Sequence, residues 1–189
     1  IVAIIATGNE LLGIGVEPEV GKIYDSYSYS LAASVRNAGG IPRLVGIALD
    51  DVDDLSNKLE AGLSSDILLT AAGVSKGDYD IVKDVIADRG QIDLWSVRMR
   101  PATPLAFGML DLNKNNPVPH LGLPGNPVSA LVGFEQFGRP MIRKMMGMLP
   151  IPKPSVKAVL DDEIINHDGR RVYARVVVYL GDRNQYRAK

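Results

Sequence analysis

Several loops of this chain carry glycines and side chains suited to an anionic ligand. In the loop GLPGNPVS, residues 122–129, Gly125 permits close approach of a ligand, Asn126 is a preferred helix N-cap, and Pro127 suits the first helical position. Helix starts of this kind favour phosphates and other oxyanions, because free backbone N–H groups point outward. The same pattern also describes an ordinary, well-capped turn between a strand and a helix. Its meaning therefore depends on whether other loops converge on it.

Carboxylates stand in further loops that follow apolar runs. The first run ends in TGNE, where Thr7 and Gly8 can present N–H groups and Glu10 a carboxylate. Asp50 lies at the end of a later run, where ligands of a parallel sheet bind. The loop AGVSKGDYD, residues 72–80, combines a hydroxyl, a cation and two carboxylates between glycines. That mixture is unusual for a purely structural turn.

Apolar runs and amphipathic patterns alternate along the first three quarters of the chain. The runs cover residues 1–6, 41–49, 66–72 and 117–124, and the helical patterns cover 24–38, 51–63, 79–89 and 127–147. This alternation predicts a three-layer α/β/α fold with a mostly parallel sheet that is covered on both faces. The loops at the carboxyl ends of the strands are then expected to meet at one edge of the sheet.

The remaining segments predict a different organisation. Residues 92–110 are expected to form two short strands broken by Pro101 and Pro104, as a hairpin or irregular excursion. The prolines of residues 150–154 predict an extended linker between a domain at 1–149 and the start of a small all-β domain at 155–189. Alternation on both sides of His167, Asp168 and Gly169 predicts a β-hairpin there. Because about 35 residues cannot form an independent core, the rest of that domain is expected outside this chain.

Composition narrows the class of protein without deciding it. The chain has 46% hydrophobic residues, 23% charged residues and a net charge of -1, so nothing favours nucleic acid or an acidic membrane as a partner. Without cysteine there is no disulfide framework, thiolate zinc site or cysteine nucleophile, and the cytoplasm is the expected location. No apolar run approaches the roughly 20 residues of a membrane span. The start at Ile1 indicates a piece of a longer protein.

The loops together carry a family resemblance. The segments that match, in order, are TGNELL (7–12), YDS (24–26), LDD (49–51), AGVSKGDYD (72–80), MRPATPLAFG (99–108) and GLPGNPVSA (122–130). Residues 1 to about 148 resemble the gephyrin-type molybdopterin molybdenumtransferases, and the tail resembles the start of their C-terminal β domain. The related competence-damage-type proteins share the TGxEL start but differ in the third of these loops.

The resemblance implies an enzyme of molybdenum cofactor synthesis that inserts molybdate into adenylylated molybdopterin and releases AMP, with Mg²⁺. It assigns the catalytic and metal-binding role to Glu10, Asp50 and Asp80, whose carboxylates need a hard cation beside an anionic substrate. The substrate-binding positions that it implies are Thr7, Gly8, Gly73, Val74, Ser75, Lys76, Gly77, Asp78, Pro101, Pro104, Pro124, Gly125, Asn126 and Ser129. A homo-oligomer is expected, with preceding domains completing the site. The alternative is a non-catalytic molybdopterin-binding or scaffold module.

Four positions depart from the family pattern. Ala102 and Thr103 stand where the family usually has Gly and Lys, so one cation expected near the substrate is missing. Arg98, Arg100 or Lys76 are candidates to replace that charge. Tyr27 replaces the usual Asn, and Ala72 stands where glycine is common. These departures fit either a changed oxyanion preference, such as tungstate for molybdate, or a weakened enzyme.

Other conspicuous side chains have structural explanations. The spacing of Met141, Met145, Met146 and Met148 indicates core or interface packing rather than a soft-metal site. Trp95 is expected to be a buried anchor, although it is also suited to stacking on a pterin. His120 and His167 lack the spacing of zinc ligands.

Overall fold

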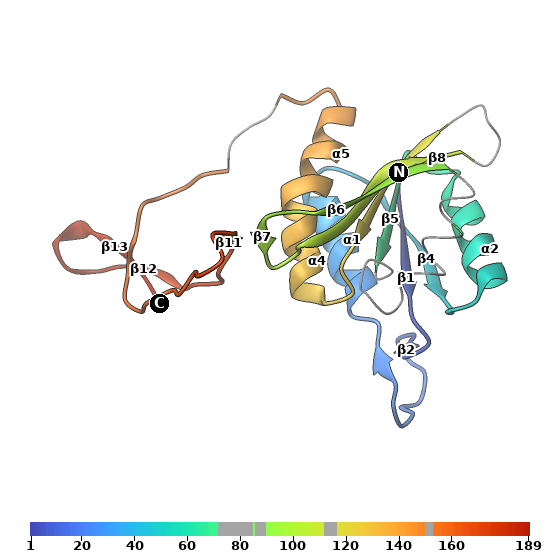
Figure 1. The fold of residues 1–189 in the computed structure, drawn as a ribbon, viewed down its shortest axis with the longest axis horizontal. Helices are drawn as coiled ribbons and strands as arrows, with labels where there is room; N and C mark the ends of the chain where they lie inside the picture. Colours follow the sequence, from blue (N-terminus) through green and yellow to red (C-terminus); the bar gives the residue numbers. More distant parts are fainter. Residues whose placement is uncertain (72–84, 86–89, 112–116, 150–152) are drawn as a thin grey trace.

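One six-stranded sheet organises the protein (Figure 1). The computed structural model describes residues 1–71, 85, 90–111, 117–149 and 153–189. The strand order is β4-β1-β5-β9-β8-β6, in which β4, β1, β5 and β9 are parallel and β8 runs antiparallel to both of its neighbours. The bounds are β1 Val2–Thr7, β4 Pro42–Ala48, β5 Ile67–Ala71, β6 Gly90–Ser96, β8 Pro104–Leu110 and β9 Val118–Leu123. The mostly parallel sheet is therefore confirmed.

Helices cover both faces of this sheet. Figure 1 shows α1 (Tyr27–Asn37), α4 (Pro127–Gly133) and α5 (Arg139–Met145) on one face and α2 (Val52–Gly62) on the other. A π-helical turn, η1 (Phe134–Gly138), joins α4 to α5 and was not predicted. Asp51 caps α2 by accepting hydrogen bonds from the N–H groups of Asp53 and Asp54. The helix expected at 79–89 lies outside the described residues apart from residue 85.

Strand β1 explains why the sheet needs a helical layer on each face. All six of its residues are buried, and successive side chains point to opposite faces. Ile4 packs into the core beneath α1 and α4, with Leu69, Leu121 and Phe134. Ile5 packs into the second core beneath α2, with neighbours that include Leu55, Leu59 and Leu68. Burial on both faces is the reason for the continuous apolar run.

The hairpin expected at 92–110 is confirmed as β6 and β8, which pair antiparallel from Gly90↔Leu110 to Ser96↔Pro104. The short strand β7 (Met99–Arg100) lies in the connection between them. The other small pair, β2 (Leu11–Leu12) and β3 (Ile23–Tyr24), is parallel and closes the excursion between β1 and α1.

The tail differs from the predicted hairpin. Its strands are β10 (Val159–Leu160), β11 (Arg171–Val172), β12 (Val178–Leu180) and β13 (Tyr186–Ala188), with a 3-10 turn, η2 (Asp182–Asn184). The hairpin at 167–169 is wrong, because β11 pairs with β7 while β10 pairs with β13. Backbone pairing to the distant segment 98–100 replaces the local pairing. Residues 150–152 of the expected linker lie outside the described part, and the domain boundaries stay a prediction.

One of the two packing predictions needs correction. Trp95 is not a buried anchor, since 43% of its surface is exposed on the edge strand β6. Met141 packs against the core, as expected, while Met145, Met146 and Met148 are exposed near the end of α5, where packing in an interface stays a prediction. Within the described ranges, no helix has the length and apolar character that crossing a bilayer requires.

His120 is expected to make stability depend on pH. It is fully buried in β9, where its Nε2 lies 2.9 Å from Thr70 Oγ1, and burial lowers its pKa from 6.5 to about 4. Between these values the unfolded chain binds a proton that the folded protein does not, so stability is complete above pH 6.5 and falls as the pH drops toward 4. Across this pH range the free energy of unfolding is expected to fall by about 3 kcal/mol.

Urea unfolding at a series of pH values measures how the free energy of unfolding changes with pH. His120→Gln should reduce this pH dependence, while His167→Gln, at an exposed position, should leave it unchanged. Equal slopes in all three proteins would contradict the prediction.

Candidate functional site

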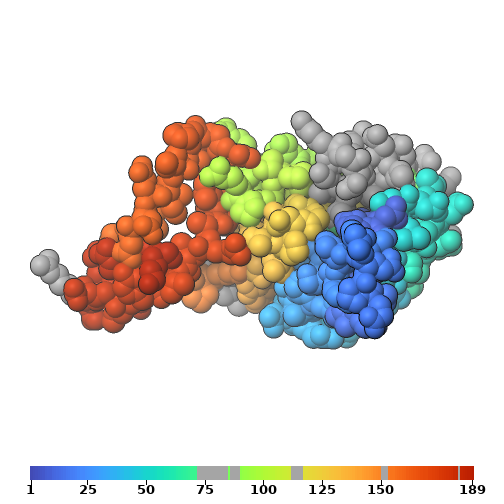
Figure 2. Space-filling view, turned by 90° about the horizontal axis from the view of Figure 1, so that it is seen from below, coloured from blue at the N-terminus to red at the C-terminus, as the bar shows by residue number. Residues whose placement is uncertain are grey.

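A small cavity lies at the carboxyl ends of β1 and β5. Its volume is about 80 Å³. Figure 2 looks onto this edge of the molecule, where the N-terminal loops (blue) lie beside the segment that begins α4 (yellow). The cavity is lined by Ala6, Thr7, Glu10, Leu11, Ile23, Tyr24, Asp25, Ser26, Tyr27, Ala71, Gly125 and Pro127. Segments from four parts of the sequence therefore meet at the edge where ligands of open α/β sheets bind.

The loops that carry Glu10 and Asp50 are joined by a reciprocal pair of hydrogen bonds. The N–H of Asn9 donates to Asp50 Oδ2 at 3.1 Å, and the N–H of Asp50 donates to Asn9 Oδ1 at 3.1 Å. Glu10 follows Asn9 directly and lines the cavity. One carboxylate of the predicted trio thus faces the cavity, and a second is bound to the residue next to it.

Gly8 is required beside these carboxylates. Its φ of 141° is unfavourable for other residues, and a Cβ built on it would lie 2.3 Å from Glu10 Oε2. Glu10 therefore folds back over the backbone of its own loop. Thr7 is buried and its hydroxyl donates to the carbonyl of Ala71 at 3.1 Å, which ties the ends of β1 and β5 together.

Buried polar groups form another wall of the cavity. Asp25 is 5% exposed and its Oδ1 accepts a hydrogen bond from the N–H of Ser28. The hydroxyl of Tyr27, which lines the cavity, and that of Ser28, which does not, are buried and have no hydrogen-bond partner among the described residues. Burial, and secondly the charge of Asp25, raise the pKa of Tyr27 well above its usual range, so this phenol stays protonated. A buried hydroxyl without a partner is costly, and a bound ligand is one way to satisfy it.

The turn before α4 is more fully satisfied than the sequence indicated. Asn126 is the N-cap and Pro127 the first helical residue, as expected. However, Asn126 Oδ1 accepts the N–H groups of Val128 and Ser129. These two N–H groups are therefore not free for a ligand, which corrects the expectation of an open helix start.

The other predicted substrate-binding positions divide into two sets. Pro124 is buried, and the side chains of Asn126 and Ser129 do not line the cavity. Pro101 lies between β7 and β8, Pro104 is the first residue of β8, and neither lines the cavity. The positions that fall outside the described residues are Gly73, Val74, Ser75, Lys76, Gly77, Asp78 and Asp80, together with Ala72.

The loop between β7 and β8 has an unusual backbone. The Arg100–Pro101 peptide bond is cis, and Ala102 has φ 70°, in the left-handed region that favours glycine. Ala102 is buried, so the strained conformation is held by packing. The resemblance places glycine at this position, and the backbone geometry gives a physical reason for that preference.

Arg170 reaches Thr103 from the tail, which sequence reasoning missed. Its Nη1 donates to Thr103 Oγ1 at 3.1 Å, and its Nε donates to Asp168 Oδ2 at 2.7 Å. The hydrogen bonds from Arg170 hold the pKa of Asp168 at about 2, so both groups are charged at neutral pH. Arg171 and Tyr173 donate their N–H groups to the carbonyls of Arg98 and Arg100, which fixes this contact. No local pattern links residue 170 to residue 103.

The fold and the cavity define an α/β ligand-binding domain with a mostly parallel sheet and its candidate site at the carboxyl edge. Comparison with known proteins gives the family. The chain belongs to the family described as probable molybdopterin binding domain, whose model matches residues 3–144. The resemblance read from the motifs is confirmed.

Named relatives agree with this assignment. The molybdopterin molybdenumtransferase of Nostoc sp. is 38% identical over 173 residues, which are 90% of this chain and 39% of the relative. Molybdopterin molybdenumtransferase 2 of Mycobacterium tuberculosis is 36% identical over 185 residues, 94% of this chain and 44% of the relative. This chain thus spans about two fifths of the curated relatives that it matches.

A solved structure supports the fold. The molybdopterin biosynthesis MoeA protein of Pyrococcus horikoshii superimposes with a TM-score of 0.72 and 23% identity, over 100% of this chain and 43% of that one. The small β structure after the sheet is included in this superposition, since the match spans the whole of this chain.

Proposed function

We propose that this chain is the molybdopterin-binding part of a molybdenumtransferase, which inserts molybdate into adenylylated molybdopterin and releases AMP. The observation that carries the proposal is the cavity at the carboxyl edge of a sheet of this family, lined by Thr7, Glu10 and Gly125. The relatives carry the name of this transferase, which supports the choice of reaction. Further domains and a second copy of the protein complete the site in this proposal.

Glu10 and Asp50 are proposed to hold Mg²⁺, with Asp80 as a third ligand. Carboxylate oxygens are the donors that this hard cation prefers, and the Asn9–Asp50 pair keeps the two loops together. No complete cluster of three acidic or histidine ligands is present among the described residues, which exclude Asp80. When bound, Mg²⁺ would neutralise anionic oxygens and polarise the phosphoanhydride.

The buried wall of the cavity is proposed to orient the substrate. The Tyr27 hydroxyl stays protonated and has no partner in the described part of the chain, so it is proposed to donate a hydrogen bond to a ligand oxygen or ring nitrogen. Asp25 lies beside it as an acceptor. A pterin carries both donors and acceptors on its edge, which suits this pair.

Release of AMP tests the proposal. Full-length protein with adenylylated molybdopterin, molybdate and Mg²⁺ should form AMP, and chelation of the metal should stop it. This chain alone is expected to turn over poorly, because it spans about two fifths of its relatives. No AMP above background from the full-length protein would leave the non-catalytic binding or scaffold module as the explanation.

Arg170 is proposed to supply the cation that Thr103 lacks. Arg170→Gln should raise the KM for molybdate about tenfold, because a hydrogen bond to a charged group contributes about 1.5–3 kcal/mol. Arg170→Lys should restore part of the loss, since the charge remains. The control is Arg175→Gln, which removes an exposed arginine of the same tail. An unchanged KM in Arg170→Gln, with AMP release intact, would refute this role and leave the proposed reaction standing.

A further inference from the structure

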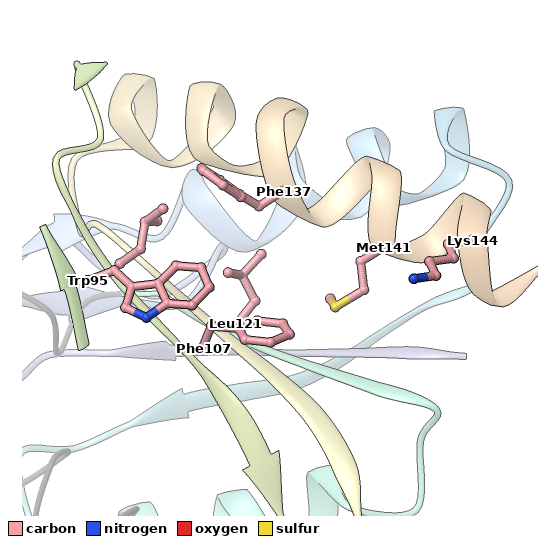
Figure 3. A pocket seen from close by; sticks show the side chains of 7 residues that line it. Trp95, Phe107, Leu121, Phe137, Met141 and Lys144 are labelled. Carbon is pink, nitrogen blue, oxygen red and sulfur yellow. The ribbon is translucent and has the colours of Figure 1, made fainter. Parts of the chain in front are cut away.

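A second and larger cavity lies on the face of the sheet, away from the candidate site. Its volume is about 270 Å³, and it lies between the hairpin β6–β8, strand β9 and the helix that runs through η1 into α5 (Figure 3). It is lined by Trp95, Leu105, Phe107, Leu121, Phe137, Met141 and Lys144. None of these residues lines the cavity at the carboxyl edge, so the two cavities are separate.

The walls of this cavity are aromatic and incompletely covered. The ring centroids of Trp95 and Phe107 lie 5.6 Å apart with an angle of 32° between their planes. Trp95 keeps 43% of its surface exposed, which leaves area of a large apolar side chain available for contact. Phe137 belongs to the π turn η1, and such turns are frequent at functional sites because they displace side chains from a regular helix.

Lys144 is the only ionisable side chain among the described residues that line the cavity. It is exposed, and it forms no ion pair with another described residue. Figure 3 shows Trp95 and Lys144 at opposite ends of the cavity, with Met141 between Lys144 and the aromatic side chains. A cation at one end of an apolar cavity complements an amphiphilic anion.

We propose that this cavity binds a planar aromatic anion, such as an aryl carboxylate or sulfonate, with its ring against Trp95 and its charge at Lys144. The volume is just below the about 300–1,000 Å³ of typical ligand pockets, which suits a small ligand. Molybdopterin does not fit these walls. Its many polar atoms would be left without partners among leucine, phenylalanine and methionine side chains.

Binding of two matched dyes tests the proposal. Anilinonaphthalene sulfonate is an aromatic anion, and phenylnaphthylamine is its neutral counterpart. Because Trp95 is the only tryptophan of the chain, quenching of its emission reports a dye bound in its neighbourhood. We expect saturable binding of the anionic dye with one site per chain, and weaker binding to Trp95→Ala when the fluorescence of the dye itself is measured.

Removing the charge of Lys144 distinguishes a site for aromatic anions from an apolar surface without selectivity. Lys144→Met should lower the affinity for the anionic dye about threefold to tenfold and leave the affinity for the neutral dye unchanged, since only the ion contact is lost. Lys157→Met removes an exposed lysine of the tail and should change neither affinity. Equal affinity of the anionic dye for wild type and Lys144→Met, or binding without saturation, would overturn the proposal. That result would indicate an apolar surface for a protein partner instead.

Discussion

Replacing Glu10 with Gln is expected to lower the rate of AMP release by about 100-fold or more while the domain stays folded. A divalent metal contributes several kcal/mol of charge stabilisation to a reacting phosphoryl group. Glutamine keeps the size of the side chain that lies over Gly8 but removes the negative charge that faces the cavity. A higher Mg²⁺ concentration should restore part of the rate, since the remaining carboxylates still attract the metal.

The matched control is Glu17→Gln, which removes an exposed carboxylate from the same excursion between β1 and α1. Its rate of AMP release should equal that of the wild type. The midpoint of thermal unfolding should be the same in both variants. From the family resemblance, Asp80→Asn should behave like Glu10→Gln. A normal rate with normal Mg²⁺ dependence in Glu10→Gln would refute the metal role of this residue.

The sheet was predictable because its signals are local. Strands β1 and β5 are buried along their whole length, so each is encoded as a nearly continuous apolar run. The caps of α2 and α4 are encoded within three residues by Asp51 and Asn126. Pro101 and Pro104 marked the break between β6 and β8 for the same reason, since proline acts on its immediate neighbours.

The features that the sequence did not predict correctly depend on contacts between distant segments of the chain. The pattern around residues 167–169 is that of a hairpin, yet β11 pairs with β7, more than seventy residues earlier in the chain. Arg170 meets Thr103 through the same pairing of β11 with β7, so no local pattern in the sequence indicated its place beside the loop between β7 and β8. Trp95 was expected to be buried because of its type, but β6 is the edge strand and leaves it exposed. Periodicity indicates which face is apolar and not which segment covers it.

Replacing Gly108 with Ala is expected to cost about 3 kcal/mol or more of stability, at the upper end of the range for overpacking. Gly108 lies in β8 opposite Ile92 of β6 and His120 of β9. A Cβ at this position would lie 2.1 Å from the carbonyl oxygen of Gln91 and 2.7 Å from the Cα of Ile92. Both neighbours are backbone atoms, so the strand itself must move and its ladder hydrogen bonds weaken.

The control for this variant is Gly13→Ala. The nearest atom to a Cβ at Gly13 is Val16 Cγ2, at an ordinary contact distance of 3.9 Å. That variant should unfold within about 0.5 kcal/mol of the wild type, as surface substitutions do. Urea unfolding measured by circular dichroism compares the two. Because a domain is stable by only about 5–15 kcal/mol, the lower midpoint of Gly108→Ala should be obvious. Equal midpoints for both variants would show that β6 and β8 do not approach each other this closely.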